Sequence, residues 1–319
     1  TGLLARALAA GARLETGIRV LRLESAGDRV TAALCRRGAA DDVRVEANTF
    51  VLAAGGLGTP RLLLLSSSPD WPKGLANGSG LVGRGLMLHP YGRADGLFAE
   101  PLGGWAPGER AGIVSFEFLP TRPGRGFVRG LKLQLTPGPS PAALARGAGT
   151  GQALPWGPGH HAAFERVFDR MLGLTVCAED LAEDDNRVTL STRLRDRDGL
   201  PAARMVYRVS GNSRRALDFG LDRSEDGLRG AGATACFRTP LRDQAGFHLM
   251  GTARMGTDPA RSVVDSHGRC HELANLVIAD ASAFVTASCV NPTATAQAIA
   301  LRAADRLVTA RKPGRAADC

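Results

Sequence analysis

The sequence predicts a mixed α/β fold, in which strands of two kinds occur together with helices, and three features indicate it. Residues 50–54 form a continuous apolar run, which is typical of a strand buried on both faces. Residues 114–118 and 131–135 instead alternate apolar and polar side chains, as half-buried antiparallel strands do. Near the end of the chain, an apolar strand over 276–279 precedes a helix over 292–308 whose Ala, Ile and Leu residues form the packed face.

Other elements follow from local signals along the chain. Residues 1–17 are expected to form an amphipathic helix that runs into a strand. Residues 18–35 predict two strands joined by a turn at 26–28. A further helix is expected to begin at Thr59, which can cap it, with Pro60 in its first turn. Additional strands and one long helix are predicted at 174–177, 187–190, 205–209 and 212–229.

The length of 319 residues suffices for two ordinary domains or one large one. Residues 136–160 are rich in proline and glycine and are too long for an ordinary connection between elements. Such a stretch is either a flexible surface loop or a lid over an active site, and both interpretations stay open.

The composition is that of a globular protein and favours neither a nucleic-acid partner nor a membrane span. Hydrophobic residues make up 44% of the chain and charged residues 22%, and no apolar run reaches the roughly 18 residues that a span requires. The formal net charge is +9. Its arginines are scattered and often stand beside acids, whereas nucleic-acid binders concentrate charge on one stripe with interleaved aromatic residues.

Six cysteines are spread along the chain without a C-x-x-C pair, which argues against a zinc ribbon and a disulfide scaffold. The spacing is typical of reduced thiols, so we expect a cytoplasmic protein. His267, Cys270 and His271 stand close together, but no second cluster of ligand residues accompanies them. No metal site is therefore predicted.

The C-terminal segment holds the residues best suited to chemistry. A strand ends at Asp280, and after a loop Asn291-Pro292 open a helix, whose free N–H groups and positive end favour an anionic group. Asn291 is also a favoured helix cap and Pro292 a favoured first helical residue, so capping explains the pair without catalysis. His248 stands between apolar neighbours before a Gly-Thr turn. It is either a buried core histidine or a catalytic one.

Several motifs occur along the chain in a definite order. The C-terminal ones are HLMGTARMG at 248–256, VVD at 263–265, NL at 275–276, ADAS at 279–282 and NPT at 291–293. The upstream ones are AGGLGTPRLLLLS at 54–66, LVGR at 81–84 with Leu86, HP at 89–90, NRVTL at 186–190 and DGLP at 198–201. In order and spacing the set resembles the glucose–methanol–choline (GMC) family of flavin-dependent oxidoreductases over residues 10–310.

Two features depart from the family pattern. The family usually reads Asp-x-Ser-x-Phe-Pro-Thr after the last strand, whereas here Val285 follows Phe284. In the upstream motif, Gly56 stands where the family often has Ala or Ser, and Ser67 stands where it often has Gly. These differences bear on the placement of the substrate and not on the family.

The resemblance implies part of a Rossmann-like FAD-binding domain joined to a substrate domain with an antiparallel sheet. GMC enzymes begin with a strand–G-x-G-x-x-G–helix unit that binds the ADP half of FAD. No such unit is present here, so we expect the chain to be the C-terminal two-thirds of such an enzyme. The implied boundaries are 1–92 for the remainder of the FAD-binding domain, 93–235 for the substrate domain, 236–311 for a C-terminal segment that returns to the FAD domain with the catalytic residues, and 312–319 for a tail.

The resemblance also implies the chemistry, which is FAD-dependent oxidation of an alcohol CH–OH group with hydride transfer to flavin N5. His248 matches the catalytic base of the family, and Asn291 matches its partner, whose amide would hydrogen-bond the substrate oxygen. The implied contacts to FAD are Val20, Ala54, Gly55, Asp280, Ala281, Asn291, Pro292 and Thr293.

Three alternatives stay open at this point. Oxygen or an electron carrier would accept the electrons, which makes the enzyme an oxidase or a dehydrogenase. The alcohol would be a sugar, polyol, amino sugar or sterol-like molecule, with polar ones favoured by family frequency. In a different functional class, the chain would be a non-catalytic fragment or a subunit that needs a separate FAD-binding chain.

Overall fold

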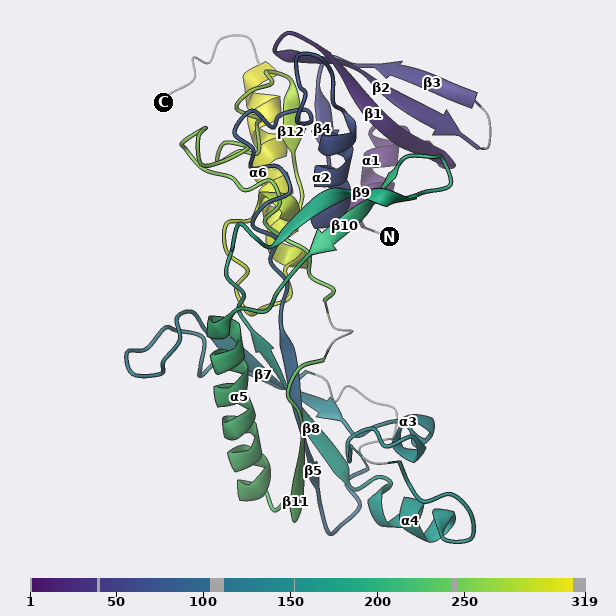
Figure 1. Cartoon of the computed structure of the whole chain (residues 1–319), viewed down its shortest axis with the longest axis vertical. Coiled ribbons are helices and arrows are strands. Elements are labelled where there is room, and N and C mark those ends of the chain that lie inside the picture. The colour runs from purple at the N-terminus through teal and green to yellow at the C-terminus, as the bar shows by residue number, and fades with distance from the viewer. Residues whose placement is uncertain (1, 39–40, 104–111, 152, 243–245, 312–319) are drawn as a thin grey trace.

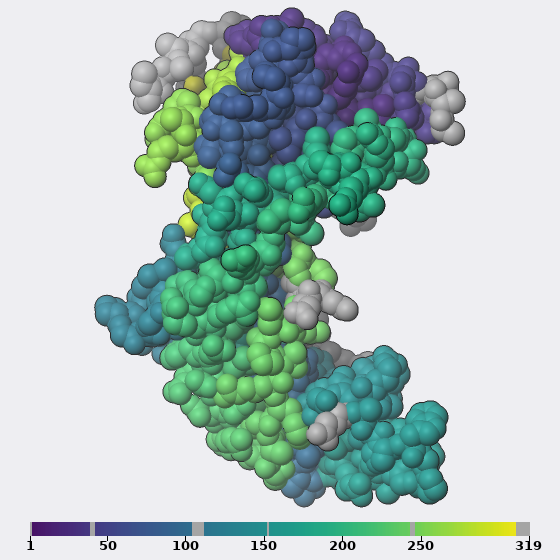
Figure 2. Space-filling model, in the orientation of Figure 1, coloured from purple at the N-terminus to yellow at the C-terminus, as the bar shows by residue number. Residues whose placement is uncertain are grey.

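The computed structural model describes residues 2–38, 41–103, 112–151, 153–242 and 246–311, which form two halves arranged along the long axis of the molecule (Figure 1). The upper half contains the first and the last described helices, and the lower half contains a five-stranded sheet. The space-filling view narrows between the halves and is hollowed on one side, between residues 187–206 and residues 153–167 (Figure 2).

The upper half begins with a helix and a three-stranded antiparallel sheet, and the predicted hairpin over 18–35 is confirmed. β1 and β2 pair along their whole length, and the turn falls between them at Gly27 and Asp28. The third strand was not predicted. The elements are α1 (Leu3–Ala9), β1 (Ile18–Ala26), β2 (Arg29–Arg37) and β3 (Asp41–Glu46).

The apolar run at 50–54 forms a strand, β4 (Phe50–Leu52), that pairs in parallel with β12 (Leu276–Ile278). Phe50 and Leu52 are buried, but Val51 is 50% exposed. The expectation that both faces are buried is therefore wrong for the described chain, because among the described residues the other face of this strand pair has no covering layer over Val51.

The helix after β4 is α2 (Gly55–Leu65), and it begins four residues before the predicted start at Thr59. Thr59 does not cap it. Its hydroxyl donates to the Asp280 carboxylate at 2.6 Å and accepts the Ala54 N–H at 3.2 Å. Pro60 accordingly lies inside the helix, where its missing N–H leaves the carbonyl of Gly56 without a helical partner.

The lower half is a five-stranded antiparallel sheet with one long helix, α5 (Gly211–Gly230), packed on one face (Figure 1). The predicted strands at 131–135 and 174–177 and the predicted helix at 212–229 are confirmed, whereas the strand expected at 114–118 covers only two residues. The strands are β5 (Tyr91–Leu97), β6 (Val114–Ser115), β7 (Leu131–Pro137), β8 (Met171–Ala178) and β11 (Ala235–Thr239). Of these, β5 and β11 were not predicted.

The Pro/Gly-rich stretch at 136–160 has partial secondary structure. β7 extends to Pro137. The short helix α3 (Pro141–Ala145) follows, and its residue Leu144 is buried. Residue 152 lies outside the described residues. The next helix, α4 (His160–Val167), leads directly into β8.

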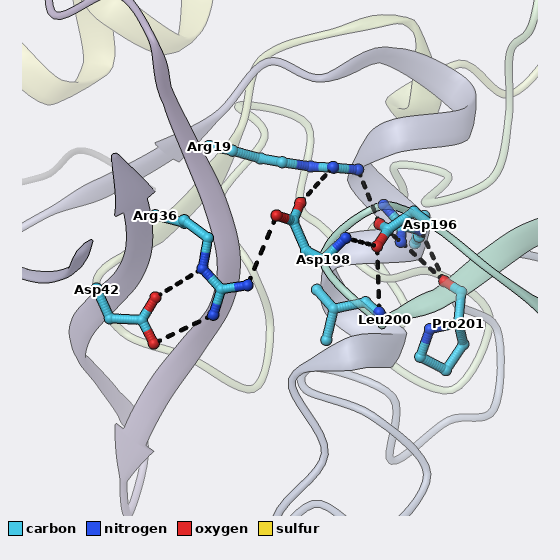
Figure 3. A network of polar contacts seen from close by, with 8 residues as sticks. Arg19, Arg36, Asp42, Asp196, Asp198, Leu200 and Pro201 are labelled. Atoms are coloured by element: carbon cyan, nitrogen blue, oxygen red, sulfur yellow. Dashed lines mark hydrogen bonds and ion pairs between the residues drawn. The ribbon is translucent and has the colours of Figure 1, made fainter. Parts of the chain in front are cut away.

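A hairpin of β9 (Arg187–Arg195) and β10 (Pro201–Val206) lies against the upper half, although it follows the lower sheet in the chain (Figure 1). Its turn is held by arginines of β1, β2 and α2 (Figure 3). Arg19 pairs with Asp198 and, at 2.8 Å, with Asp196. Arg61 reaches the same Asp196 carboxylate at 2.5 Å. The expected substrate segment 93–235 thus supplies elements to both halves.

The chain ends with a short 3₁₀ turn, η1 (Ala281–Ala283), and the long helix α6 (Thr293–Arg311). The predicted packed face of α6 is only partly correct, because Ala303 is buried whereas Leu301 is 56% exposed. The expected tail at 312–319 lies outside the described residues. No helix in the described ranges is long and apolar enough to cross a membrane.

Candidate active site

His248 lies in a loop that other segments hold by backbone hydrogen bonds. Met250 exchanges two such bonds with Met87, at 3.0 and 3.1 Å. Beyond it, three successive bonds join the loop to η1, the first from Gly251 N–H to the Ala281 carbonyl at 3.0 Å. The backbone that follows His248 is therefore fixed by two different segments of the chain.

The N-terminal turn of α2 also fixes this loop. Thr252 donates its hydroxyl hydrogen at 2.9 Å to the Gly56 carbonyl that Pro60 leaves free. A Cβ at Gly56 would collide with the backbone carbonyl of Leu249. Glycine at this position, noted above as a departure from the usual Ala or Ser, therefore lets the helix approach the residue next to His248.

His89, which was not among the predicted site residues, is the nearest polar neighbour of His248. The two Nδ1 atoms lie 2.7 Å apart, and the rings meet edge to face with centroids at 4.8 Å. The Nε2 atom of His89 lies 3.2 Å from the carbonyl oxygen of Ala287. Asp180 accepts the N–H of Leu88 at 3.1 Å, which fixes the backbone just before His89.

Both imidazoles are neutral near pH 7. Burial lowers the pKa of His89 to about 4, and the bond to Ala287 opposes this only in part. Burial also lowers the pKa of His248 from its ordinary 6.5, and the positive charge of Lys132 acts in the same direction. Each ring therefore carries one proton, and its position follows from the hydrogen-bond partners.

The hydrogen bonds assign these two protons. A carbonyl oxygen can only accept, so Nε2 of His89 carries its proton and donates to Ala287. Nδ1 of His89 then has a lone pair and accepts from Nδ1 of His248. The remaining ring nitrogen of His248, Nε2, is consequently unprotonated. The arrangement thus presents His248 as a base with its free lone pair directed away from His89.

Asn291 does not cap α6, and this expectation is wrong. The helix begins at Thr293, and the Pro292 carbonyl makes its first bond, with Ala296 N–H at 2.9 Å. The Oδ1 atom of Asn291 instead accepts from Nζ of Lys132 at 2.6 Å. In the alternating pattern of residues 131–135, Lys132 falls on the polar side of the strand, which is normally exposed to solvent. In the structure this lysine is only 3% exposed.

Most predicted FAD contacts come together at one place, the carboxyl ends of the parallel strands β4 and β12. Ala54 and Gly55 follow β4, and Asp280 and Ala281 follow β12. The Asp280 carboxylate accepts from Gly55 N–H at 2.9 Å and from Ser282 N–H at 2.7 Å. Ligands of α/β sheets bind at such an edge.

The other predicted FAD contacts divide between this edge and a separate strand. Ala281 packs in one apolar cluster with Ala296 of the first turns of α6, which brings Asn291, Pro292 and Thr293 toward the edge. α6 has no acidic residue in its first turn, so its N-terminus suits an anionic group, whereas the N-terminus of α2 already holds the Asp280 carboxylate. Val20 lies apart on β1, with its side chain 43% exposed. These residues fit a flavin nucleotide.

A cavity of about 200 Å³ borders His89 and is lined by Tyr91 and Tyr207 among others. The hydroxyl of Tyr91 lies 3.3 Å from Nδ1 of His248. Within the described ranges, no group of three or more metal-ligating side chains gathers here or elsewhere. His271, part of the sequence cluster considered above, lies 2.9 Å from the hydroxyl of Ser262.

Comparison with known proteins gives the family. The C-terminal model of the GMC oxidoreductases matches residues 182–300, and the N-terminal model matches residues 1–91. The chain is 37% identical over 304 residues to 2-methyl-1,2-propanediol dehydrogenase of Mycolicibacterium austroafricanum, a match that covers 94% of this chain and 55% of the relative. This chain belongs to the GMC oxidoreductase family.

Other GMC oxidoreductases are similar to a comparable extent. The fructose dehydrogenase large subunit of Gluconobacter japonicus is 33% identical, with 95% of this chain and 55% of the relative covered. The 6'''-hydroxyparomomycin C oxidase of Streptomyces lividus is 33% identical, with coverages of 95% and 53%. The chain therefore spans about half the length of the curated relatives that it matches.

Solved structures show the same fold. Pyridoxine 4-oxidase from Mesorbium loti superposes with a TM-score of 0.64 at 19% identity, over 92% of this chain and 57% of that one. Formate oxidase of Aspergillus oryzae gives a TM-score of 0.61 at 16% identity, with coverages of 92% and 60%. GMC oxidoreductases are flavoproteins that oxidise alcohols and sugars, and their cofactor is FAD.

Proposed function

We propose that this chain carries the catalytic residues of an FAD-dependent enzyme that oxidises the CH–OH group of a polar alcohol. The bonding order Ala287–His89–His248 supports this proposal most directly, because it leaves Nε2 of His248 unprotonated. A base of this kind removes the hydroxyl proton as hydride leaves the carbinol carbon. When bound, FAD supplies the acceptor for that hydride.

Asn291 is assigned to the substrate oxygen. Its carbonyl oxygen is engaged by Lys132, so its NH₂ group is the end that remains to donate. An amide donor stabilises the negative charge that develops on the oxygen once His248 has taken the proton. The two residues thus divide the work, since His248 holds the proton and Asn291 holds the oxygen.

FAD is assigned to the carboxyl-terminal edge of β4 and β12. Gly55 and Ala281 present backbone at this edge, and Asp280 holds both segments together. Pro292 and Thr293 bring the positive end of α6 close to the same place, which favours a negatively charged flavin. Ala54 completes the edge, and Val20 is assigned to the adenine end through the backbone of β1.

A polar substrate is supported by the sheet face that carries Tyr91. Arg93 and Asp95 lie on this face beside Tyr91, and the neighbouring strands contribute further polar side chains to it. The opposite positions of β5 are small and pack against α5, where a Cβ at Gly92 would lie 3.4 Å from Leu221. The polar set comprises Arg93, Asp95, Gln134, Thr136 and Thr175. The relatives whose names specify a diol, a sugar and an aminoglycoside agree with this choice.

The test uses the enzyme with its complete FAD-binding domain, mixed anaerobically with alcohols in a stopped-flow instrument. D-fructose, 2-methyl-1,2-propanediol and paromamine should bleach the flavin at least about tenfold more efficiently than a long-chain primary alcohol. His248→Ala should slow the reduction by about two to four orders of magnitude and remove the acidic limb of the pH profile. A flavin that none of these alcohols reduces would favour the non-catalytic alternative, whereas a His248→Ala enzyme of normal rate would exclude His248 as the base.

A further inference from the structure

A row of three side chains crosses the lower sheet and ends at the candidate active site. In the strand register, Tyr91 of β5 stands opposite Cys177 of β8, which in turn stands opposite Lys132 of β7. Directly opposed residues share one face of a sheet. The neighbouring residue Leu131 points to the other face, where it packs in the core beneath α5. The row therefore faces away from α5.

Both ends of this row reach the site. Tyr91 places its hydroxyl 3.3 Å from Nδ1 of His248, and Lys132 places its ammonium 2.6 Å from Oδ1 of Asn291. Lys132 and Asn291 are 159 residues apart in the sequence, so this bond depends on the tertiary fold. Lys132 is buried behind Asn291, whereas Asn291 itself is exposed. The lysine therefore acts through the asparagine and does not touch the substrate.

The ammonium group of Lys132 has an unusual environment. Within the described ranges, no carboxylate lies within 4.0 Å of it, and it donates a hydrogen bond to the neutral amide of Asn291. Burial of a lysine without a carboxylate is costly, so a structural role alone gives a poor reason for its presence. Its uncompensated charge acts on the neighbouring histidine, and it is one cause of the lowered pKa of His248.

The chemistry of the pair fixes the orientation of the amide. An ammonium group can only donate, so Asn291 must turn its oxygen toward Lys132 and its NH₂ group the opposite way. An asparagine without such a partner can present either end, and only the NH₂ end stabilises an alkoxide. We propose that Lys132 is a positioning residue, which locks the Asn291 amide with its donor toward the substrate oxygen and adds a positive charge behind it. This inference rests on the proposed function.

The first test is a double-mutant cycle in the holoenzyme. Lys132→Met removes the charge and the donor at similar length, and it should slow flavin reduction about tenfold to a hundredfold. In an Asn291→Ala background the same change should have almost no further effect, because the lysine acts through that amide. The matched control is Lys73→Met, at an exposed lysine outside the site, which should leave the rate unchanged.

A second readout separates orientation from charge. In Lys132→Met the acidic limb of the pH profile should move to higher pH, because a charge that lowers the pKa of His248 has been removed. Lys132→Gln restores a donor for Oδ1 without the charge, so it should recover much of the rate and keep the shifted limb. Unchanged flavin absorbance and melting temperature show that each variant has folded.

The outcomes distinguish the positioning role of Lys132 from the proposed function on which it rests. Equal slowing by Lys132→Met with and without Asn291 would overturn the positioning role, as would a Lys132→Met enzyme of normal rate and normal pH profile. A wild-type holoenzyme whose flavin the polar alcohols do not reduce would instead remove the proposed function, and a His248→Ala enzyme that reduces flavin normally would remove His248 as its base. A slow His248→Ala enzyme beside a normal Lys132→Met enzyme leaves the function and rejects Lys132 alone.

Discussion

Nδ1 of His89 lies 2.7 Å from Nδ1 of His248, although the two residues are 159 positions apart in the chain. The pair is anchored at one end by the Ala287 carbonyl and is open at the other. Because a carbonyl cannot donate, this anchor decides where the proton of each ring resides. The outermost ring nitrogen then has a lone pair even though, among the residues that the structure describes, no carboxylate orients the base.

Replacing His89 tests whether its hydrogen bond orients the imidazole of His248. His89→Phe keeps a ring in the pocket but removes the acceptor for the Nδ1 proton of His248. The flavin-reduction rate should fall about tenfold to a hundredfold, as is usual when the group that orients a functional histidine is lost. Stopped-flow reduction with saturating alcohol measures the rate, and His161→Phe, at an exposed histidine, is the control. A rate like that of wild type would show that His248 needs no orienting partner.

His89 should also make stability depend on pH. Its pKa is about 4 in the folded protein and about 6.5 in an unfolded chain, so the unfolded state binds more protons between these values. The contribution is fully present above pH 6.5 and is lost as the pH falls toward 4, by an amount on the order of 3 kcal/mol.

Urea unfolding of the holoenzyme at pH 5 and at pH 7.5 measures this dependence. His89→Gln should reduce the difference in unfolding free energy between the two pH values, whereas His161→Gln should preserve it. An unchanged difference in His89→Gln would mean that His89 is protonated in the folded protein or that other groups set the slope.

Asn291→Asp separates the binding of Lys132 from the stabilisation of the substrate oxygen. The new carboxylate would still accept from the ammonium of Lys132, so the melting temperature should stay near normal. Its negative charge would oppose the developing alkoxide, and flavin reduction should slow by about two orders of magnitude. Asn291→Ala should be less stable than Asn291→Asp, because it leaves the buried ammonium without its partner. An Asn291→Asp enzyme with a normal reduction rate would exclude the amide donor from the mechanism.

FAD binding tests the expectation that a further unit is needed. Residues 1–319 contain no strand–G-x-G-x-x-G–helix unit, and that unit holds the pyrophosphate in such folds. Produced alone, the chain should bind FAD more weakly than about 1 μM, whereas fusion behind such a unit from a relative should give a yellow protein. Isothermal titration measures the affinity, and submicromolar binding by residues 1–319 would contradict the expectation.

The sequence predicted the elements whose side chains follow a simple period. The hairpin of β1 and β2, the helix α5 and the strand β12 have regular apolar patterns, and the structure confirms them. β5 escaped prediction because its inner positions are Gly92, Ala94 and Gly96 and the positions between them are the charged Arg93 and Asp95. Small residues pack closely against a helix without giving an apolar signal.

The site was predicted in part. The motif predicted His248 as the candidate base, but its hydrogen-bond partner His89 was noted only as part of a short motif. Lys132 fell on the polar side of an alternating strand, and such a side is normally solvated. Here that side faces the site, and no local pattern distinguishes the two environments. Asn291 shows the reverse problem, because its ideal capping position in the sequence concealed a long-range bond to Lys132.

The hairpin of β9 and β10 has a mechanical consequence. Because it returns to the upper half, the described chain passes between the halves four times, before β5, after β8, before α5 and after β11. A single connection would let the two halves rotate relative to each other. Four connections restrict that rotation and leave only a small sliding motion. His89 lies on the first of these connections and His248 follows the last, so a change in the angle between the halves would act directly on the contact between the two imidazoles.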